Sequence, residues 1–376
     1  MTVIASTSNY GYPIIIGDLL ISAEADRSIG LPTTSTDIDI FVNKTRKYKP
    51  VTLFRKIYVI KPNLVVGLAG SVLQMKYFLN ELEMRSRLYD SFSKSELVTF
   101  LDEYPLENFD QSAALIHLAD NSSENPDDWN HIVYRFGNWM ESASNLFEKV
   151  MATGSGLEEF VHQATTDGTL FTGFKQHSFR HALSVNINHI VKLLGAEHIS
   201  LYNIEENWGA GYEIAYFNGD SFNLLDGITY LICDIPIDQN GDLNYISPKT
   251  IMHYEYYNQD LHIQAFEVQL SKVARGENSE LITSDDFINK HFRVLPINFD
   301  HNGLEQQFIP GNFRSQKIAI CFNIIIDDKS FFTPTLFAER PDISISYNGE
   351  DNLTITLPND LLSKIKTTAK EAFLKF

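Results

Sequence analysis

Four residues among the first seventy carry chemical groups that suit covalent catalysis: Thr2, Asp18, Lys56 and Gly70. Thr2 combines two such groups, because removal of Met1 would leave a hydroxyl and a free α-amine on one residue. An α-amine has an ordinary pKa of about 7.7–8.0, so it is partly neutral at cellular pH and can take a hydroxyl proton. Considered alone, Thr2 is better explained as a β-branched residue that begins a strand.

Asp18 and Lys56 are charged residues inside otherwise apolar segments, IIIGDLLI and LFRKIYVI. A buried charge is costly unless it is paired, so the two side chains could neutralise each other. A buried ammonium beside Thr2 would also favour the alkoxide and keep the α-amine deprotonated. A purely structural ion pair, or two charges on solvent-facing strand positions, would explain the same residues.

Gly70 lies in the segment GLAGS, where an apolar run ends and a helix is expected to begin. A backbone N–H at such a junction, with no side chain in the way, can donate a hydrogen bond to an oxyanion. A glycine that only makes the turn would look the same. A second glycine turn, Gly154-Ser155-Gly156, follows the apolar run VMAT and also leads into an expected helix.

The elements that would position these residues follow from hydrophobic periodicity and turn residues. Strands, two helices, strands, two helices and strands are expected in that order, which predicts two packed sheets with helices outside each. The expected strands are residues 2–7, 12–22, 53–60 and 63–70, and the expected helices start near Ser71, Ser95, Leu157 and His177. The helix over 177–194 shows one apolar face. Later in the chain we expect a buried strand over 317–326, a hairpin over 343–356 and a last helix after Pro358.

Together these segments resemble the N-terminal nucleophile (Ntn) hydrolases of the proteasome β-subunit type, including the bacterial two-component, proteasome-like threonine peptidase. Thr2 with TVIAS, and IIIGD ending at Asp18, match the family's spacing without a gap. The segment KIYVIKPNLVVGLAGS matches from Lys56 to Gly70, and the Gly-Ser-Gly turn matches at Ser155.

The resemblance implies a role for each matched residue. Thr2 would be the nucleophile, with its α-amine as general base. Lys56 would tune the nucleophile, and Asp18 would hold Lys56. The Gly70 N–H would form the oxyanion hole, and Ser155 would support the terminal amine.

The resemblance also implies the fold class, α+β, as a four-layer αββα Ntn-hydrolase sandwich over residues 1–236. An insertion of about residues 23–50 lengthens the interval between Asp18 and Lys56. A mostly-β C-terminal domain of unknown role would occupy residues 237–376. The segment EENWGAGYEI offers Glu205 or Glu206 in place of the family's Asp, and it lacks the family's Ser.

The expected function is hydrolysis of an amide bond, in first place a peptide bond, through an acyl-enzyme on Thr2. Two alternatives stay open: a non-peptidase amidase or acylase of the same fold, and a catalytically inactive scaffold or binding protein. In the scaffold, the C-terminal domain would bind a protein partner. Family resemblance further suggests a homo-oligomer, often a ring.

No cofactor or metal is expected. His177, His181 and His189 have helical spacing, but no acid or cysteine completes a ligand set, so a polar exposed face is the favoured interpretation. The formal net charge of −18 argues against nucleic acid as a partner, and the basic cluster Lys44–Lys49 is interpreted as a solvated loop. No apolar run is long enough for a membrane span, and no secretory leader is recognised. Cys233 and Cys321 lack metal or redox spacing, which favours a reducing compartment, the cytoplasm.

Overall fold

A computed structural model of the chain describes residues 2–9, 11–25, 29–33, 48–104, 111–120, 130–144, 147–165, 170–171, 178–200, 202–237, 245–297, 311–315, 317–326, 329–332, 334–339, 342–349 and 352–373. His177 and most of the basic cluster that begins at Lys44 lie outside these residues, as does the greater part of the expected insertion.

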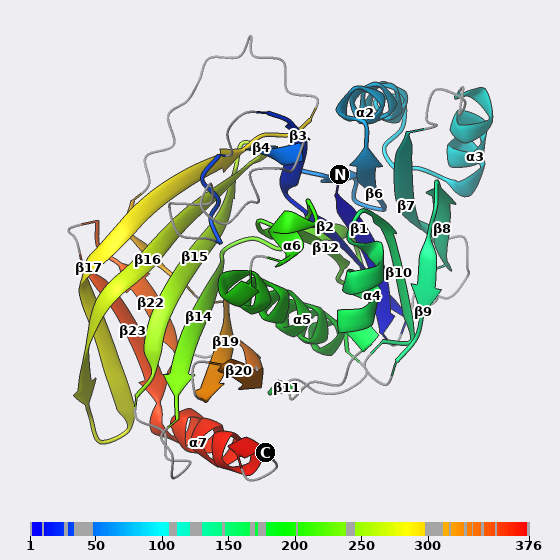
Figure 1. Ribbon diagram of the computed structural model, residues 1–376. Coiled ribbons are helices and arrows are strands. Elements are labelled where there is room, and N and C mark those ends of the chain that lie inside the picture. Colours follow the sequence, from blue (N-terminus) through cyan, green and yellow to red (C-terminus); the bar gives the residue numbers. More distant parts are fainter. Residues whose placement is uncertain are drawn as a thin grey trace.

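The N-terminal strands lie at the centre of a six-stranded antiparallel sheet (Figure 1). β1 (Val3–Asn9) pairs with β2 (Tyr12–Asp18) on one side and with β10 on the other. Because Ile14, Ile15 and Ile16 are all buried, both faces of β2 are covered, as an uninterrupted apolar run predicts. The order across the sheet is β13 (Phe222–Leu224), β12 (Tyr212–Phe217), β2, β1, β10 (Lys149–Gly154) and β9 (Met140–Ser142).

A four-stranded antiparallel sheet packs face to face on the first one. Apolar side chains from both sheets, including Ile4, Ile15 and Val65, form the core between them. The helices α2 (Val72–Ser86) and α3 (Lys94–Glu103) cover the outer face of this second sheet. Its strands in order are β5 (Ile57–Lys61), β6 (Leu64–Gly70), β7 (Ser112–Asp120) and β8 (Asn130–Phe136); β3 (Leu20–Glu24) and β4 (Tyr48–Leu53) form a separate ribbon.

The largest element is an eleven-stranded sheet that curls into a half-barrel on the left of Figure 1. Its order is β11 (Leu170–Phe171), β21 (Thr335–Ala338), β19 (Lys317–Ile326), β14 (Ile228–Pro236), β15 (Ser247–Tyr257), β16 (Asp260–Arg275), β17 (Ser279–Val294), β23 (Leu353–Pro358), β22 (Ser344–Tyr347) and β18 (Phe313–Arg314), with β20 (Lys329–Phe332) paired to β19. The expected strand over 317–326 and the expected hairpin are confirmed as β19 and β22–β23. The last helix is α7 (Asn359–Phe373). Its Leu361, Leu362 and Ile365 pack in a hydrophobic core with side chains of the eleven-stranded sheet.

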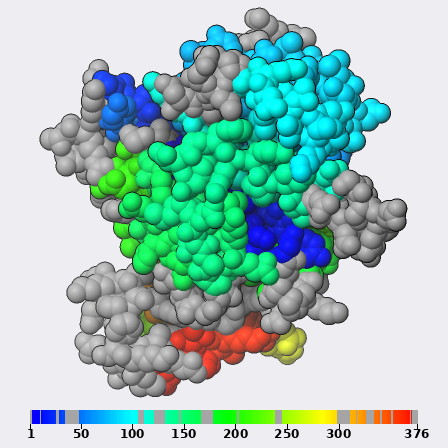
Figure 2. Space-filling view, turned by 90° about the vertical axis from the view of Figure 1, so that its right-hand side faces the viewer, coloured from blue at the N-terminus to red at the C-terminus, as the bar shows by residue number. Residues whose placement is uncertain are grey.

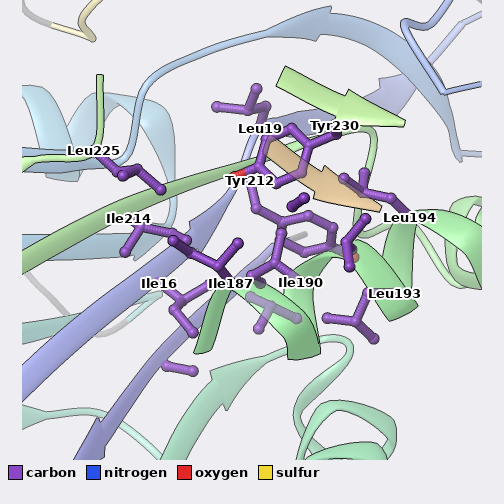
Figure 3. Close-up of a cluster of buried hydrophobic side chains, with 14 of the residues drawn as sticks. Ile16, Leu19, Ile187, Ile190, Leu193, Leu194, Tyr212, Ile214, Leu225 and Tyr230 are labelled. Atoms are coloured by element: carbon purple, nitrogen blue, oxygen red, sulfur yellow. The ribbon is translucent and has the colours of Figure 1, made fainter. Parts of the chain in front are cut away.

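The helix α5 (Phe179–Ser200) lies between the six-stranded sheet and the half-barrel, with the short α6 (Tyr202–Glu205) after it. The helix α4 (Leu157–Thr165) packs on β1, β9 and β10 of the six-stranded sheet. The hydrophobic core around α5 contains side chains of both the six-stranded sheet and the half-barrel. Figure 3 shows Ile187 and Ile190 of α5 among Ile16 of β2, Tyr212 of β12 and Tyr230 of β14. This single core joins the first strands of the chain to the half-barrel.

The expected four-layer αββα Ntn-hydrolase sandwich with an appended mostly-β domain is wrong. The described residues are 53% strand and 25% helix, and large antiparallel sheets with a curled half-barrel dominate them. The physical reason lies in α5, where every residue from Ala182 to Val191 is buried. A helix that forms an outer layer buries one stripe only, whereas the half-barrel covers the second side of α5. The boundary expected near residue 236 stays a prediction, although β14 pairs with both β15 and β19.

Candidate active site

Asp18 is the centre of a buried cluster of hydrogen bonds. It is the last residue of β2 and has no exposed surface. Its Oδ1 accepts hydrogen bonds from Thr2 Oγ1 at 2.5 Å, Lys56 Nζ at 2.6 Å and the Val3 N–H at 2.8 Å. Its Oδ2 accepts one from the Gly209 N–H at 2.9 Å. Four donors around one carboxylate balance its buried charge, which answers why an acid follows an isoleucine run.

Lys56 is as fully buried as Asp18. It lies between β4 and β5, and its ammonium donates both to Asp18 and to the carbonyl of Leu20 at 2.6 Å. Burial lowers the pKa of Lys56 from its ordinary value, and the Asp18 carboxylate opposes that shift. The two charges are therefore a buried pair and do not lie on solvent-facing positions.

Both the hydroxyl and the carbonyl of Thr2 form hydrogen bonds. It immediately precedes β1 and is 2% exposed, and its carbonyl accepts the Ser155 N–H at 2.8 Å. The Ser155 hydroxyl lies 3.5 Å from the same carbonyl oxygen and 3.4 Å from that of Asn207. Gly154 allows this close approach, since a Cβ placed on it would lie 1.7 Å from the Thr2 oxygen. Figure 2 shows only limited patches of the N-terminal strands, in blue, between later segments of the chain.

Gly70 lines a pocket at the same end of the strands. It ends β6 with a φ of 109° and is followed by Ser71, the residue that precedes α2. Gly154, next to the Thr2 carbonyl, lines the same pocket, whose volume is about 360 Å³. The described residues that line it are uncharged: Ala69, Gly70, Gln111, Ser112, Ala113, Gly137, Asn138, Thr153, Gly154 and Leu157.

The structure thus places Thr2, Asp18 and Lys56 in one hydrogen-bonded cluster, sets Ser155 against the Thr2 backbone and sets Gly70 in the neighbouring pocket. Their catalytic roles stay predictions.

The turn from Asn207 to Gly211 closes over Asp18 through a backbone group that was not expected from the sequence. Glu205 and Glu206 are half-buried in α6 and just after it, and the group that reaches Asp18 is the Gly209 N–H. Four residues of this turn have a positive φ: Asn207, Gly209, Ala210 and Gly211. A non-glycine residue such as Ala210 pays for that conformation in strain, which surrounding contacts must offset. The two glycines in WGAG were the available signal for such a turn.

Glu197 on α5 supplies the contacts that hold this turn. Its carboxyl accepts the Ala210 N–H at 3.1 Å and the Tyr212 hydroxyl at 2.7 Å, and it is fully buried. Burial raises the pKa of Glu197 to about 7, while these hydrogen bonds oppose the shift. Glu197 was not expected, because an acid near a helix end normally faces solvent.

Glu197→Gln is expected to remove one pH-dependent part of the stability. Between about pH 4.5 and about pH 7 the folded Glu197 carboxyl keeps a proton that the unfolded one has lost, so the wild-type free energy of unfolding falls as pH rises through this window. The fall amounts to roughly 3 kcal/mol at about 1.4 kcal/mol per unit of pKa. Urea unfolding of both proteins at pH 4.5, 6 and 7.5 measures the difference, in which the contributions of the buried histidines cancel. Parallel curves for the two proteins would contradict this assignment.

We compared the chain with known proteins once this geometry was established. No family model matches it. A search of curated proteins likewise finds no significant similarity. The assignment of chemistry to this site therefore depends on the residues, their contacts and the resemblance of the motifs described above.

The helix with three histidines differs from its expected form. His189 is buried, not exposed, and its ring packs edge-on against Phe160 and Phe147. Burial lowers the pKa of His189 to about 3. Within the described ranges, no three His, Cys, Asp or Glu side chains are grouped so that they could hold a metal ion. In the same part of the chain, no helix has both the length and the apolar character to cross a membrane.

Proposed function

We propose that this protein is an N-terminal threonine hydrolase that cleaves an amide bond through an acyl-enzyme on Thr2. The observation that carries the proposal is the shared oxygen of Asp18, which binds both the Thr2 hydroxyl and the Lys56 ammonium. A nucleophile, a buried cation and a carboxylate that orients both are the parts that activation of a hydroxyl needs. The similarity of the motifs to the Ntn hydrolases supports the same chemistry.

In the proposed reaction, loss of Met1 frees the α-amine of Thr2. The amine takes the hydroxyl proton as Oγ1 adds to the amide carbon of the substrate. The Lys56 ammonium supplies positive charge next to Oγ1, and the Gly70 N–H would donate to the oxyanion. The amine then passes its proton to the leaving nitrogen as the C–N bond breaks. Water hydrolyses the resulting ester and restores Thr2.

The pocket beside Gly70 and Gly154 supports an uncharged acyl or amine group as the part of the substrate bound there, because the described residues that line it are uncharged. We infer that the substrate is a peptide or a protein. The homo-oligomer and the ring remain proposals from the resemblance. A protein partner for residues 237–376 remains a proposal that belongs to the scaffold alternative. Both cysteines are free and buried, which supports a reducing compartment.

The decisive test combines an intact mass with covalent labelling. We expect purified protein to lack Met1, and we expect a peptide epoxyketone to add one equivalent at Thr2, because this reagent reacts with a hydroxyl and an amine on the same residue. Thr2→Ala should lose the label, and Thr2→Ser should keep it, since serine retains both groups. A mass that includes Met1, or equal labelling of wild type and Thr2→Ala, would refute the proposal.

The two alternative functions give different results. A non-peptidase amidase would hydrolyse small acyl amides and leave a peptide panel intact. An inactive scaffold would show retained Met1 and no turnover or labelling in any panel.

A further inference from the structure

The backbone of Arg55 and Lys56 is held by the Glu213 side chain and by backbone groups of two other segments. Arg55 and Lys56 fall in the gap between β4 and β5. The Lys56 N–H donates to Glu213 Oε2 at 2.7 Å, and its carbonyl accepts the Leu68 N–H at 2.9 Å. The Arg55 N–H donates to the carbonyl of Leu295, just beyond β17 of the half-barrel, at 3.0 Å. The position of Lys56 therefore depends on groups from other parts of the fold.

Glu213 links Lys56 to the strand that lies beside Asp18. In the pairing of β12 with β2, Tyr212 is opposite Asp18 and Glu213 is opposite Gly17. The Glu213 Oε1 accepts Arg55 Nε at 2.7 Å and the Tyr256 hydroxyl at 3.0 Å. Its side chain has no exposed surface. One buried carboxylate thus sets the Lys56 backbone at a fixed place relative to the strand of Asp18.

Arg55 extends this network to the half-barrel. Its guanidinium donates to the carbonyls of Ile57, at 2.9 Å, and of Gln259. It lies 5.7 Å from the ring centroid of Tyr58 and 4.9 Å from that of Tyr256, within the range of cation–π attraction. The guanidinium is thus shared between β5, which follows Lys56, and the turn between β15 and β16.

The turn that Arg55 contacts is itself strained. Asn258 and Gln259 connect β15 to β16 with φ values of 49° and 71°. Two-residue hairpin turns need positive φ at both positions, and glycine normally supplies at least one of them. Neither residue is glycine here, so contacts such as the one from Arg55 to the Gln259 carbonyl help to hold the conformation.

We propose that Arg55 and Glu213 are positioning residues for Lys56, through which the β15–β16 turn of the half-barrel governs how closely the Lys56 ammonium is held to Asp18. Neither residue lies in the Asp18 cluster, and each acts through the Lys56 backbone. The effect of the network on catalysis rests on the proposed function, whereas its effect on the Lys56 side chain does not.

The test uses Arg55→Lys and Tyr256→Phe in the full chain. Arg55→Lys keeps the charge but loses the forked donors that reach Glu213, Ile57 and Gln259 at once. Tyr256→Phe removes one hydrogen bond to Glu213 from the half-barrel and keeps the ring, so it serves if Arg55→Lys fails to fold. Lys272→Met is the matched control, because Lys272 forms an exposed ion pair with Asp285 on the same sheet.

Two readouts separate this proposal from the proposed function. The first is proton exchange of the Lys56 ammonium, followed by NMR with labelled lysine; we expect about tenfold faster exchange in Tyr256→Phe, and more in Arg55→Lys. The second is epoxyketone labelling: we expect its rate to fall by a similar factor and its pH profile to shift. Lys272→Met should match wild type in both. If wild type does not label, the proposed function fails, and the exchange rates still decide the positioning role. Wild-type exchange in Arg55→Lys and Tyr256→Phe would overturn the proposal.

Discussion

Lys56→Met is expected to lower the free energy of unfolding by about 3–5 kcal/mol and to slow the reaction of Thr2 by roughly 10²–10⁴-fold. Methionine replaces much of the lysine stem but carries no charge. The Asp18 carboxylate would keep the Thr2, Val3 and Gly209 donors and lose the ammonium 2.6 Å away. An uncompensated buried charge is what makes the loss of one partner so costly. Urea unfolding and the labelling rate measure the two effects.

The double variant Asp18→Asn/Lys56→Met separates stability from chemistry. It leaves no buried charge at the site, so we expect it to be more stable than Lys56→Met. We expect no recovery of labelling, because the cation beside Thr2 is still missing. Lys272→Met, at an exposed lysine, should change neither quantity. A Lys56→Met protein as stable as wild type would contradict the buried pair.

Gly154→Ala is expected to have the second-largest effect. A Cβ at this position would lie 1.7 Å from the Thr2 carbonyl oxygen and 2.7 Å from its carbon, so the backbone of one strand must move. The Ser155 N–H bond to that oxygen would be lost or stretched. We expect a loss of about 3–5 kcal/mol from backbone strain and overpacking together, and roughly 10²-fold slower labelling from misplacement of Thr2 by about an ångström. Thermal unfolding and labelling rates measure these effects.

Gly219→Ala is the matched control for Gly154→Ala. Gly219 has a φ of 103°, against 102° for Gly154, but a Cβ there meets no atom within 4 Å. The control should show only the cost of the positive φ, about 1–2 kcal/mol, with unchanged labelling. Equal losses in the two variants would mean that the contact with Thr2 has no effect of its own.

The central part of the candidate site could be predicted from the sequence because two charges in apolar strands need each other. Asp18 follows one apolar run and Lys56 interrupts another, and both runs must be buried. Pairing the two residues was the simplest way to balance their charges. The two glycine turns near Gly70 and Ser155 carried a comparable signal, since few other residues make such turns. The roles of these residues in catalysis remain to be tested by the variants above.

The groups that complete the site could not be predicted in the same way. Gly209 is 191 positions from Asp18, and Glu213 is 158 positions from Arg55. The first contact joins a backbone N–H to a carboxylate and the second joins a guanidinium to a carboxylate, and neither leaves a periodic pattern in the sequence. Acids such as Glu205 and Glu206 can be recognised in a sequence as candidates for the family's Asp, whereas a backbone donor such as the Gly209 N–H cannot.

The local elements of this chain are determined by the sequence itself: the apolar strand before Asp18, the helix after Ser71, β19, and the hairpin of β22 and β23 all follow from short-range pattern. The tertiary structure decided that α5 is covered on both sides, although polar residues such as Ser184, Asn186 and Asn188 are typical of an exposed helix face. These side chains donate mainly to carbonyls of their own helix, those of His181, Ala182 and Ser184, and Asn186 also accepts a hydrogen bond from Thr7 of β1. An exposed polar side chain can make the same bonds within its helix, so the sequence pattern is the same in both cases and only the fold distinguishes them.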